Sequence, residues 1–101
     1  MSFENNQSPD VWQVAQLILQ NSKNIVPLVG VQPVYMHPFS VAQKVATLGL
    51  IYGRLVDLNM IAGADRRELA MLGDRLSHDD RYVRLSEYIQ IVRGVRWWAF
   101  D

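Results

Sequence analysis

The chain has 101 residues with ten basic and ten acidic side chains, and its formal net charge is zero. This length supports one hydrophobic core, and a neutral chain lacks the excess positive charge on which nucleic-acid binding depends. The sequence contains no cysteine, which excludes disulfides and thiolate metal sites, and no apolar run approaches the roughly 20 residues of a membrane span. We therefore expect a cytoplasmic protein, and its half-apolar composition favours a homodimer.

The first part of the chain predicts one helix and an extended connection. Residues 1–7 are polar and predict a flexible lead-in, followed by a single helical domain over 8–101. Ser8, Pro9 and Asp10 have the pattern of a helix start, and the apolar spacing behind them predicts a helix that ends near residues 20–23. Prolines recur among the apolar residues of 24–39, so we expect an ordered, extended segment there with at most one edge strand.

Residues 40–61 predict a long helix that is apolar on nearly every side. Ser40 and Gln43 have the spacing of a capping box at its start. Its small residues, among them Gly49 and Gly53, form a ridge that lets another backbone approach closely. That backbone is either another helix of the same chain or the same helix of a second copy. A helix with so little polar surface belongs at the centre of the fold.

Two further helices are predicted after this one. Asp65 and Glu68 have the spacing of a second capping box, which opens a third helix. A fourth helix is predicted over residues 81–93, with Gly94 as its C-terminal stop. The predicted fold class is therefore mainly α, a compact four-helix domain with a long central helix. Residues 24–39 and 95–100 are expected to be irregular or to form a minimal β pair between 25–35 and 95–100.

The sequence contains no pattern that indicates catalysis. Ser77, His78 and Asp79 are adjacent in sequence, so they cannot converge as a nucleophile, a base and an orienting acid. Asp79 and Asp80 are explained as favourable acids at the start of a helix. We therefore expect no enzymatic activity, no catalytic residue, no metal site and no cofactor.

Two groups of residues are candidates for contacts to a partner protein: Arg66, Arg67, Arg96, Trp97, Trp98 and Phe100. Tryptophan and arginine dominate binding hot spots, whereas a chain terminus is usually polar. The aromatic C-terminal segment either folds back onto the core or recognises a partner, and both hold if one tryptophan points inward and the other outward. The two arginines at the start of the third helix, which the macrodipole disfavours, are either exposed charges without consequence or contacts to an anionic partner.

These observations predict a non-enzymatic protein-binding module, such as an adaptor, an inhibitor or a regulatory subunit that acts stoichiometrically on another protein. The alternative is a DNA-binding transcriptional regulator in which residues 66–93 form a helix-turn-helix, with Arg81 and Arg84 reading the bases. Two aspartates at the start of the recognition helix, the zero net charge and the expected placement of Gly73 inside the preceding helix argue against this alternative.

Overall fold

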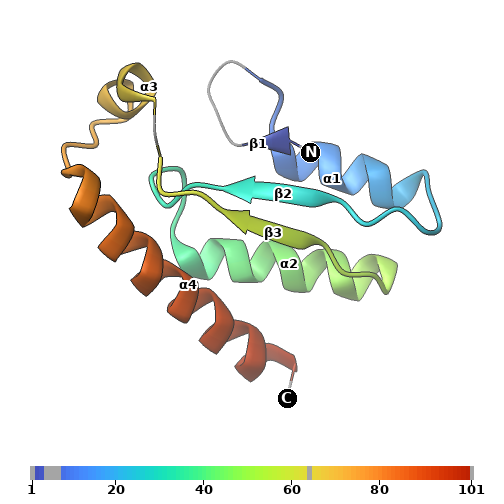
Figure 1. The fold of residues 1–101 in the computed structure, drawn as a ribbon. Helices are drawn as coiled ribbons and strands as arrows, with labels where there is room; N and C mark the ends of the chain where they lie inside the picture. Colours follow the sequence, from blue (N-terminus) through green and yellow to red (C-terminus); the bar gives the residue numbers. More distant parts are fainter. Residues whose placement is uncertain (1, 4–7, 64, 101) are drawn as a thin grey trace.

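The computed structural model describes residues 2–3, 8–63 and 65–100, with the side chains of 8–63 and 65–95. Strands and helices alternate through the first part of the chain (Figure 1). The elements are β1 (Ser2–Phe3), α1 (Val11–Gln20), β2 (Leu28–Val31), α2 (Pro38–Tyr52), β3 (Asp57–Met60), α3 (Arg66–Met71) and α4 (His78–Phe100). In the described part of the chain, no helix is long and apolar enough to cross a membrane.

The three strands form a parallel sheet in the order β1-β2-β3. Along β2 and β3 the register pairs Leu28 with Asp57 and Val31 with Met60. Parallel neighbours need a crossover connection, and α1 and α2 supply these connections. Because such crossovers are right-handed and the strands follow one another in order, both helices lie on the same face of the sheet.

A single hydrophobic core fills the space between that face and the helices. Val29 and Val31 point into it from β2 and are 2% and 0% exposed. The other core residues come from α1, α2, α4 and the end of the α2–β3 connection: Val11, Trp12, Ala15, Leu19, Val41, Val45, Leu48, Val56, Tyr88 and Val92. Leu28 and Asp57 alternate with inward-pointing neighbours and are exposed, so the second face of the sheet is uncovered at the start of β2 and β3. Further along this face Gly30 is buried and Asn59 is half-buried.

The long helix predicted over 40–61 is wrong in its second half. Helix α2 ends at Tyr52, and residues 57–60 form a strand. Gly53 caps the helix in the left-handed conformation, with φ at +63°, and its N–H donates to the carbonyl of Gly49 at 2.8 Å. A Cβ at Gly53 would meet nothing within 4 Å. Gly53 is therefore a helix stop and not part of a packing ridge.

The predicted starts of the first two helices are also wrong: the N-cap of the first lies two residues later than Ser8, and that of the second three residues earlier than Ser40. His37 is the N-cap of α2, and its Nδ1 accepts a hydrogen bond from the N–H of Phe39 at 3.2 Å. Pro38 then occupies the first helical position, where its missing N–H costs nothing. In α1 the N-cap is Asp10, whose Oδ2 accepts from the N–H of Gln13 at 2.9 Å. Each start has a cap of its own that satisfies an orphan backbone donor.

The predicted β pair between 25–35 and 95–100 is wrong, whereas the mainly α character and the four helices are confirmed for the described residues. Strand β2 pairs with β1 and β3 instead, and residues 95–100 are the last part of α4. Helix α4 continues through Gly94 because an interior glycine costs only about 1 kcal/mol, which packing against α2 offsets. Ser2 and Phe3, placed in the lead-in, form β1, and residues 4–7 lie outside the described part.

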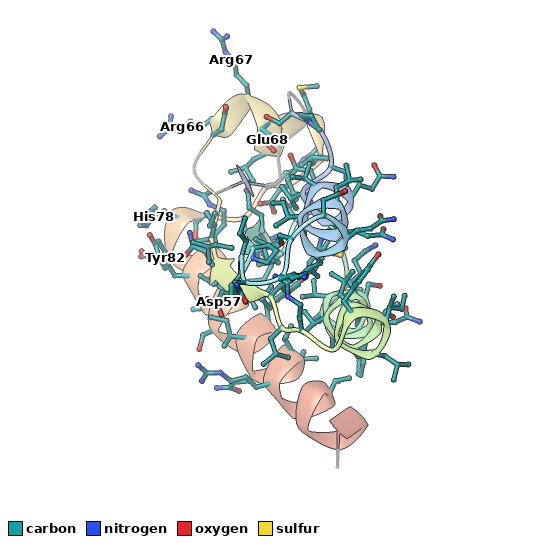
Figure 2. All side chains as sticks on the ribbon, turned by 90° about the vertical axis from the view of Figure 1, so that its right-hand side faces the viewer. Asp57, Arg66, Arg67, Glu68, His78 and Tyr82 are labelled. Carbon is teal, nitrogen blue, oxygen red and sulfur yellow. The ribbon has the colours of Figure 1, made fainter. Side chains whose placement is uncertain are left out.

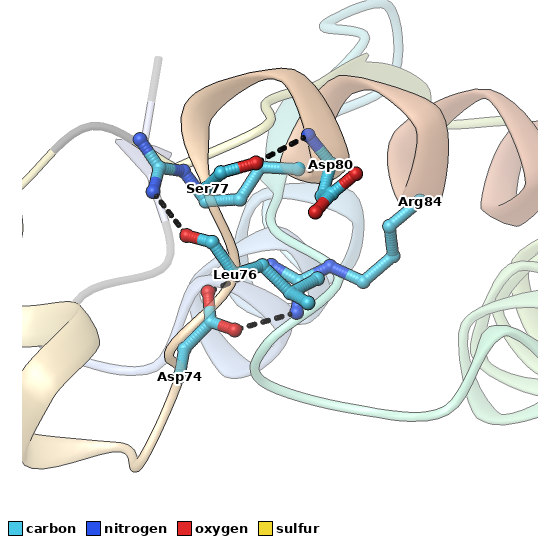
Figure 3. Close-up of polar contacts among 6 residues, drawn as sticks. Asp74, Leu76, Ser77, Asp80 and Arg84 are labelled. Carbon is cyan, nitrogen blue, oxygen red and sulfur yellow. Dashed lines mark hydrogen bonds and ion pairs between the residues drawn. The ribbon is translucent and has the colours of Figure 1, made fainter.

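The segment between α3 and α4 is held against α4 by a bidentate ion pair (Figure 3). The Nη1 and Nη2 atoms of Arg84 donate to Oδ1 and Oδ2 of Asp74, each at 2.9 Å. The side chain of Asp74 is 5% exposed, and that of Arg84 is 26% exposed. The hydrogen bonds and charge of Arg84 hold the pKa of Asp74 below its ordinary value of 3.8.

The same segment carries two corrections to the DNA-binding alternative. Arg81 donates from Nη1 to the carbonyl of Leu76 at 2.8 Å, so both proposed base readers, Arg81 and Arg84, are used in internal contacts. Gly73, with φ at +75°, follows the C-cap Leu72 and ends α3, where an internal position was predicted. The two helices are therefore joined by a clamped connection.

Two glycine substitutions are expected to change stability in opposite directions. Gly53→Ala forces a Cβ into the left-handed conformation and should lower the free energy of unfolding by about 1 kcal/mol. Gly94→Ala lies inside a helix with open space around the new methyl group and should raise it by about 0.5–1 kcal/mol. Urea denaturation of the two variants beside the parent measures both values, and equal signs would contradict the assignment of Gly53 as the helix stop.

The Asp74–Arg84 clamp is expected to make stability sensitive to acid. Asp74→Asn should cost about 2 kcal/mol at pH 7, because it weakens charge-assisted hydrogen bonds in a buried place. Since the pKa of Asp74 is lowered by folding, its contribution is present above pH 3.8 and is lost as the pH falls through the folded-state value. Denaturation from pH 7 downward should show the gap between parent and variant closing below pH 3.8. Asp79→Asn, which removes a fully exposed charge at the start of α4, serves as the control and should change the profile far less than Asp74→Asn.

Candidate functional site

The carboxyl ends of β2 and β3 lie at one edge of the sheet, because the two strands are parallel. In Figure 1 both arrows point toward the side where α3 and the start of α4 lie. In parallel α/β folds, ligands bind at this edge, in contact with the loops that follow the strands. The loops here are residues 32–37 after β2 and residues 61–65 after β3, which leads into α3. This edge is therefore the candidate functional site.

The loop after β2 places two polar side chains at the edge. Gln32 follows the strand directly and is 8% exposed. The N–H of Tyr35 donates to the carbonyl of Gln32 at 3.1 Å and closes a turn with Pro33 at its second position, where proline is favoured. The hydroxyl oxygen of Tyr35 is buried without a hydrogen-bond partner. The hydroxyl of Tyr88 on α4 donates to the carbonyl of Met36 at 2.7 Å and fixes the loop in place.

Gly63 brings the loop after β3 against Gln32. It is buried and has a φ of +102°, a conformation that favours glycine. A Cβ at this position would lie 3.1 Å from Cδ2 of Leu69 and 3.3 Å from Oε1 of Gln32. A side chain at this position would be strained by the backbone conformation and would crowd the side chains of Leu69 and Gln32. Gly63 therefore joins the two loops into one site.

Glu68 supplies the site's one buried carboxylate among the described side chains. It is 8% exposed, and its Oε1 is buried without a hydrogen-bond partner. Figure 2 shows Glu68 turned toward the body of the molecule, whereas Arg66 and Arg67 on the same helix point away from it. An unpaired buried acceptor costs about 1–3 kcal/mol, and more when it is charged. The site therefore offers a carboxylate oxygen that can accept a hydrogen bond from an N–H or O–H group of a ligand.

The predicted capping residue of α3 is confirmed, but Glu68 was interpreted only as part of that cap. Oδ1 of Asp65 accepts from the N–H groups of Arg67 and Glu68 at 2.9 and 3.3 Å. The burial of Glu68 depends on how α3 packs against the strand ends, and no pattern within the sequence reports it. Gln32 carries no sequence signal either.

The residues that the sequence excludes as a catalytic group lie away from this edge, and the C-terminal partner-binding candidates lie beyond the described side chains. His78 contacts the ring of Tyr82 with ring centres 4.9 Å apart, and its Nδ1 lies 3.6 Å from Oδ1 of Asp79. All three are exposed, and Figure 2 shows His78 and Tyr82 on the outside of the molecule. The side chains at positions 96, 97, 98 and 100 lie outside the described residues, so the predictions made for Arg96, Trp97, Trp98 and Phe100 stay predictions.

Metal binding finds no support in this part of the chain. Among the described residues, no group of three His, Cys, Asp or Glu side chains is placed to hold a metal ion. The loop after β2 carries a carboxamide and a phenol, from Gln32 and Tyr35, and α3 after the next loop carries the carboxylate of Glu68. Such groups bind and orient the polar edge of an organic molecule.

Two comparisons relate the chain to oxygen-inserting enzymes. Residues 1–98 match the luciferase-like monooxygenase family. The chain is 37% identical over 93 residues to 4-(gamma-L-glutamylamino)butanoyl-[BtrI acyl-carrier protein] monooxygenase BtrO from Niallia circulans. This match covers 92% of the chain and 27% of BtrO, so the chain spans about a quarter of the length of that relative.

A solved monooxygenase structure also resembles this chain. EDTA monooxygenase (EmoA) from Chelativorans sp. BNC1 superposes with a TM-score of 0.73 at 25% sequence identity. The match covers 82% of this chain and 20% of the EmoA chain. The arrangement of strands and helices described above is thus found within a larger monooxygenase.

These matches overturn the prediction of a non-enzymatic adaptor, inhibitor or regulatory subunit, and with it the DNA-binding alternative and the expectation of no enzyme. The expectation of no enzyme assumed that an enzyme would show its catalytic groups close together within these 101 residues. A site at the strand ends of a parallel fold draws its groups from several loops, each of which contributes few of them. With its family match extending over residues 1–98, the chain belongs to the luciferase-like monooxygenase family.

Proposed function

We propose that this chain forms one side of the active site of a monooxygenase, with the carboxyl edge of β2 and β3 facing the substrate. The family match over residues 1–98 is the observation that carries the proposal. The reaction of such an enzyme inserts one atom of O2 into the substrate and reduces the other atom to water. This balance consumes two electrons, which a reductant must supply.

The topology supports a place in a (β/α) barrel. Three parallel strands in sequential order, with helices on one face, are the repeating pattern of that fold. The uncovered face of the sheet, which carries Leu28 and Asp57, corresponds to the side that faces a barrel interior. Active sites of barrels lie at the carboxyl ends of the strands, and Gln32 and Gly63 lie side by side in the loops that follow β2 and β3. Glu68 lies on α3, the next element after these loops.

The polar groups at this edge fit an organic redox cofactor. Oxygen chemistry in enzymes is carried by flavins, haem, copper or non-haem iron. Gln32 and Glu68 carry hydrogen-bonding groups of the kind that contact the heteroatoms of a flavin ring. A reduced flavin, when bound, supplies the two electrons. Gln32 and Glu68 would bind and orient the flavin by donating or accepting hydrogen bonds.

For the substrate we follow the relative of higher identity. BtrO is named for an acyl group carried on an acyl-carrier protein, and EmoA for EDTA. The identity to BtrO is 37% and that to EmoA is 25%. We therefore propose that the substrate is an acyl group that reaches the enzyme on a carrier protein.

Glu68→Gln is expected to lower activity without lowering stability. The substitution keeps the shape of the side chain but removes the charge of a carboxylate whose Oε1 is buried without a hydrogen-bond partner, so the melting temperature should stay the same or rise. The value of kcat/KM should fall roughly tenfold or more, because a charge-assisted hydrogen bond to the ligand is lost. The measurement is substrate-dependent oxygen consumption by the intact protein that contains this chain, with reduced flavin as reductant and 4-(γ-glutamylamino)butanoyl-BtrI as substrate.

Asp79→Asn is the matched control, since the side chain of Asp79 is fully exposed. It should change neither the melting temperature nor kcat/KM. A Glu68→Gln protein that melts at a clearly lower temperature and keeps the parent's kcat/KM would show that Glu68 is structural. Failure of the parent to consume oxygen with this substrate would count against the proposed function itself.

A further inference from the structure

Helix α3 has two faces with different chemistry. Glu68 and Leu69 are buried, at 8% and 4% exposed, and Cδ2 of Leu69 lies 3.1 Å from where a Cβ of Gly63 would be. Arg66 and Arg67 are exposed, and Figure 2 shows both side chains extending away from the body of the molecule. One helical turn further on, Ala70 lies on the stripe of Arg66 and Met71 on that of Arg67, and both are exposed. We call Arg66, Arg67, Ala70 and Met71 the outer face of α3.

The outer face of α3 carries positive charge that the neighbouring acids leave largely uncompensated. Residues 65–76 contain three arginines and three acids. Among these acids, Glu68 is buried on the inner face and Asp74 is held by Arg84. Asp65 is exposed but accepts hydrogen bonds from the first N–H groups of α3. Among the described residues, no ion pair involves Arg66 or Arg67.

The outer face also has an apolar component. The side chain of Met71 is 70% exposed beside the two arginines. Arginine with exposed methionine is the composition of a binding surface, since both are enriched at protein interfaces and methionine adapts its shape to a partner. Arg66 and Arg67 beside Met71 would therefore fit a partner surface on which carboxylates surround an apolar residue.

From this arrangement we infer that the outer face of α3 docks an acidic carrier protein, whose tethered acyl group then reaches the edge formed by Gln32, Gly63 and Glu68. The inference rests on the proposed function, which makes a carrier-bound acyl group the substrate. Position supports it, because the same short helix presents Glu68 to the site and the arginines to solvent. Charge supports it as well, because complementary surfaces steer encounter and fix orientation.

The test measures binding of fluorescently labelled BtrI acyl-carrier protein to the intact protein by anisotropy. The double substitution Arg66→Glu and Arg67→Glu should weaken the affinity about tenfold or more, because it sets like charges against the acidic partner. Lys23→Glu with Arg93→Glu is the charge-matched control, at exposed positions beyond the end of α1 and in the later part of α4, and should change the affinity by less than about twofold. Added salt should weaken binding of the parent and have little effect on the Arg66/Arg67 variant. No binding by the parent, or equal losses in both double variants, would overturn the inference.

A second measurement separates this inference from the proposed function. Oxygen consumption is followed with the acyl group on BtrI and with the same acyl group on free pantetheine. The arginine reversal should lower kcat/KM for the carrier-bound substrate alone, whereas Glu68→Gln should lower it for both. Activity of the parent on both substrates, with no effect of the arginine reversal on either, would reject the docking surface and leave the proposed function standing. No activity of the parent on either substrate would reject the proposed function.

Discussion

The parallel pairing of β2 with β3 is the constraint on which the rest of the structure depends. The register from Leu28–Asp57 to Val31–Met60 places both carboxyl ends at one edge. It requires a crossover, which α2 provides, and the alternation along β2 then turns Val29 and Val31 into the core beneath that helix. The same register brings the residues just past the strands together, so that Oε1 of Gln32 lies 3.3 Å from where a Cβ of Gly63 would be. An antiparallel pairing would send the two loops to opposite edges.

The buried, unpaired oxygen of Glu68 destabilises the fold, and the favourable interactions around it on α3 offset this cost. The unpaired oxygen of Glu68 opposes folding, since burial removes its water without supplying a donor. On the same helix Leu69 is 4% exposed and anchors α3 to the strand ends, and Asp65 caps it. Beyond the helix, the ion pair between Asp74 and Arg84 fixes the connection to α4. Local strain of this kind, supported from all sides, is characteristic of functional sites.

Much of the helical framework follows from local sequence, because caps and stops act over three or four residues. Asp65 was identified as a cap from its position before an apolar run, and the four helices were expected. The strand β3 was missed because Val56, Leu58 and Met60 are apolar and follow closely on the apolar residues of the preceding helix, so the pattern predicts its continuation. Their alternation with Asp57 and Asn59 is a period of two, and Gly53 before them is the stop that decides between the two interpretations. Pairing with β2, which is distant in sequence, selects the strand.

The site was harder to predict because its members are ordinary residues until the fold brings them together. Gln32 and Glu68 lie 36 positions apart in the sequence (68 − 32). Gln32 stands between Val31 and Pro33, and the charged neighbours of Glu68, Arg66 and Arg67, indicated a capped helix with exposed arginines. Burial gives the two residues their significance, and burial is a result of tertiary packing. In a parallel α/β fold each loop contributes one or two polar groups, so a short part of such an enzyme shows no cluster of catalytic residues. The observation that identifies a site in such a segment is therefore an unsatisfied buried group, as at Glu68, in a place where ligands bind.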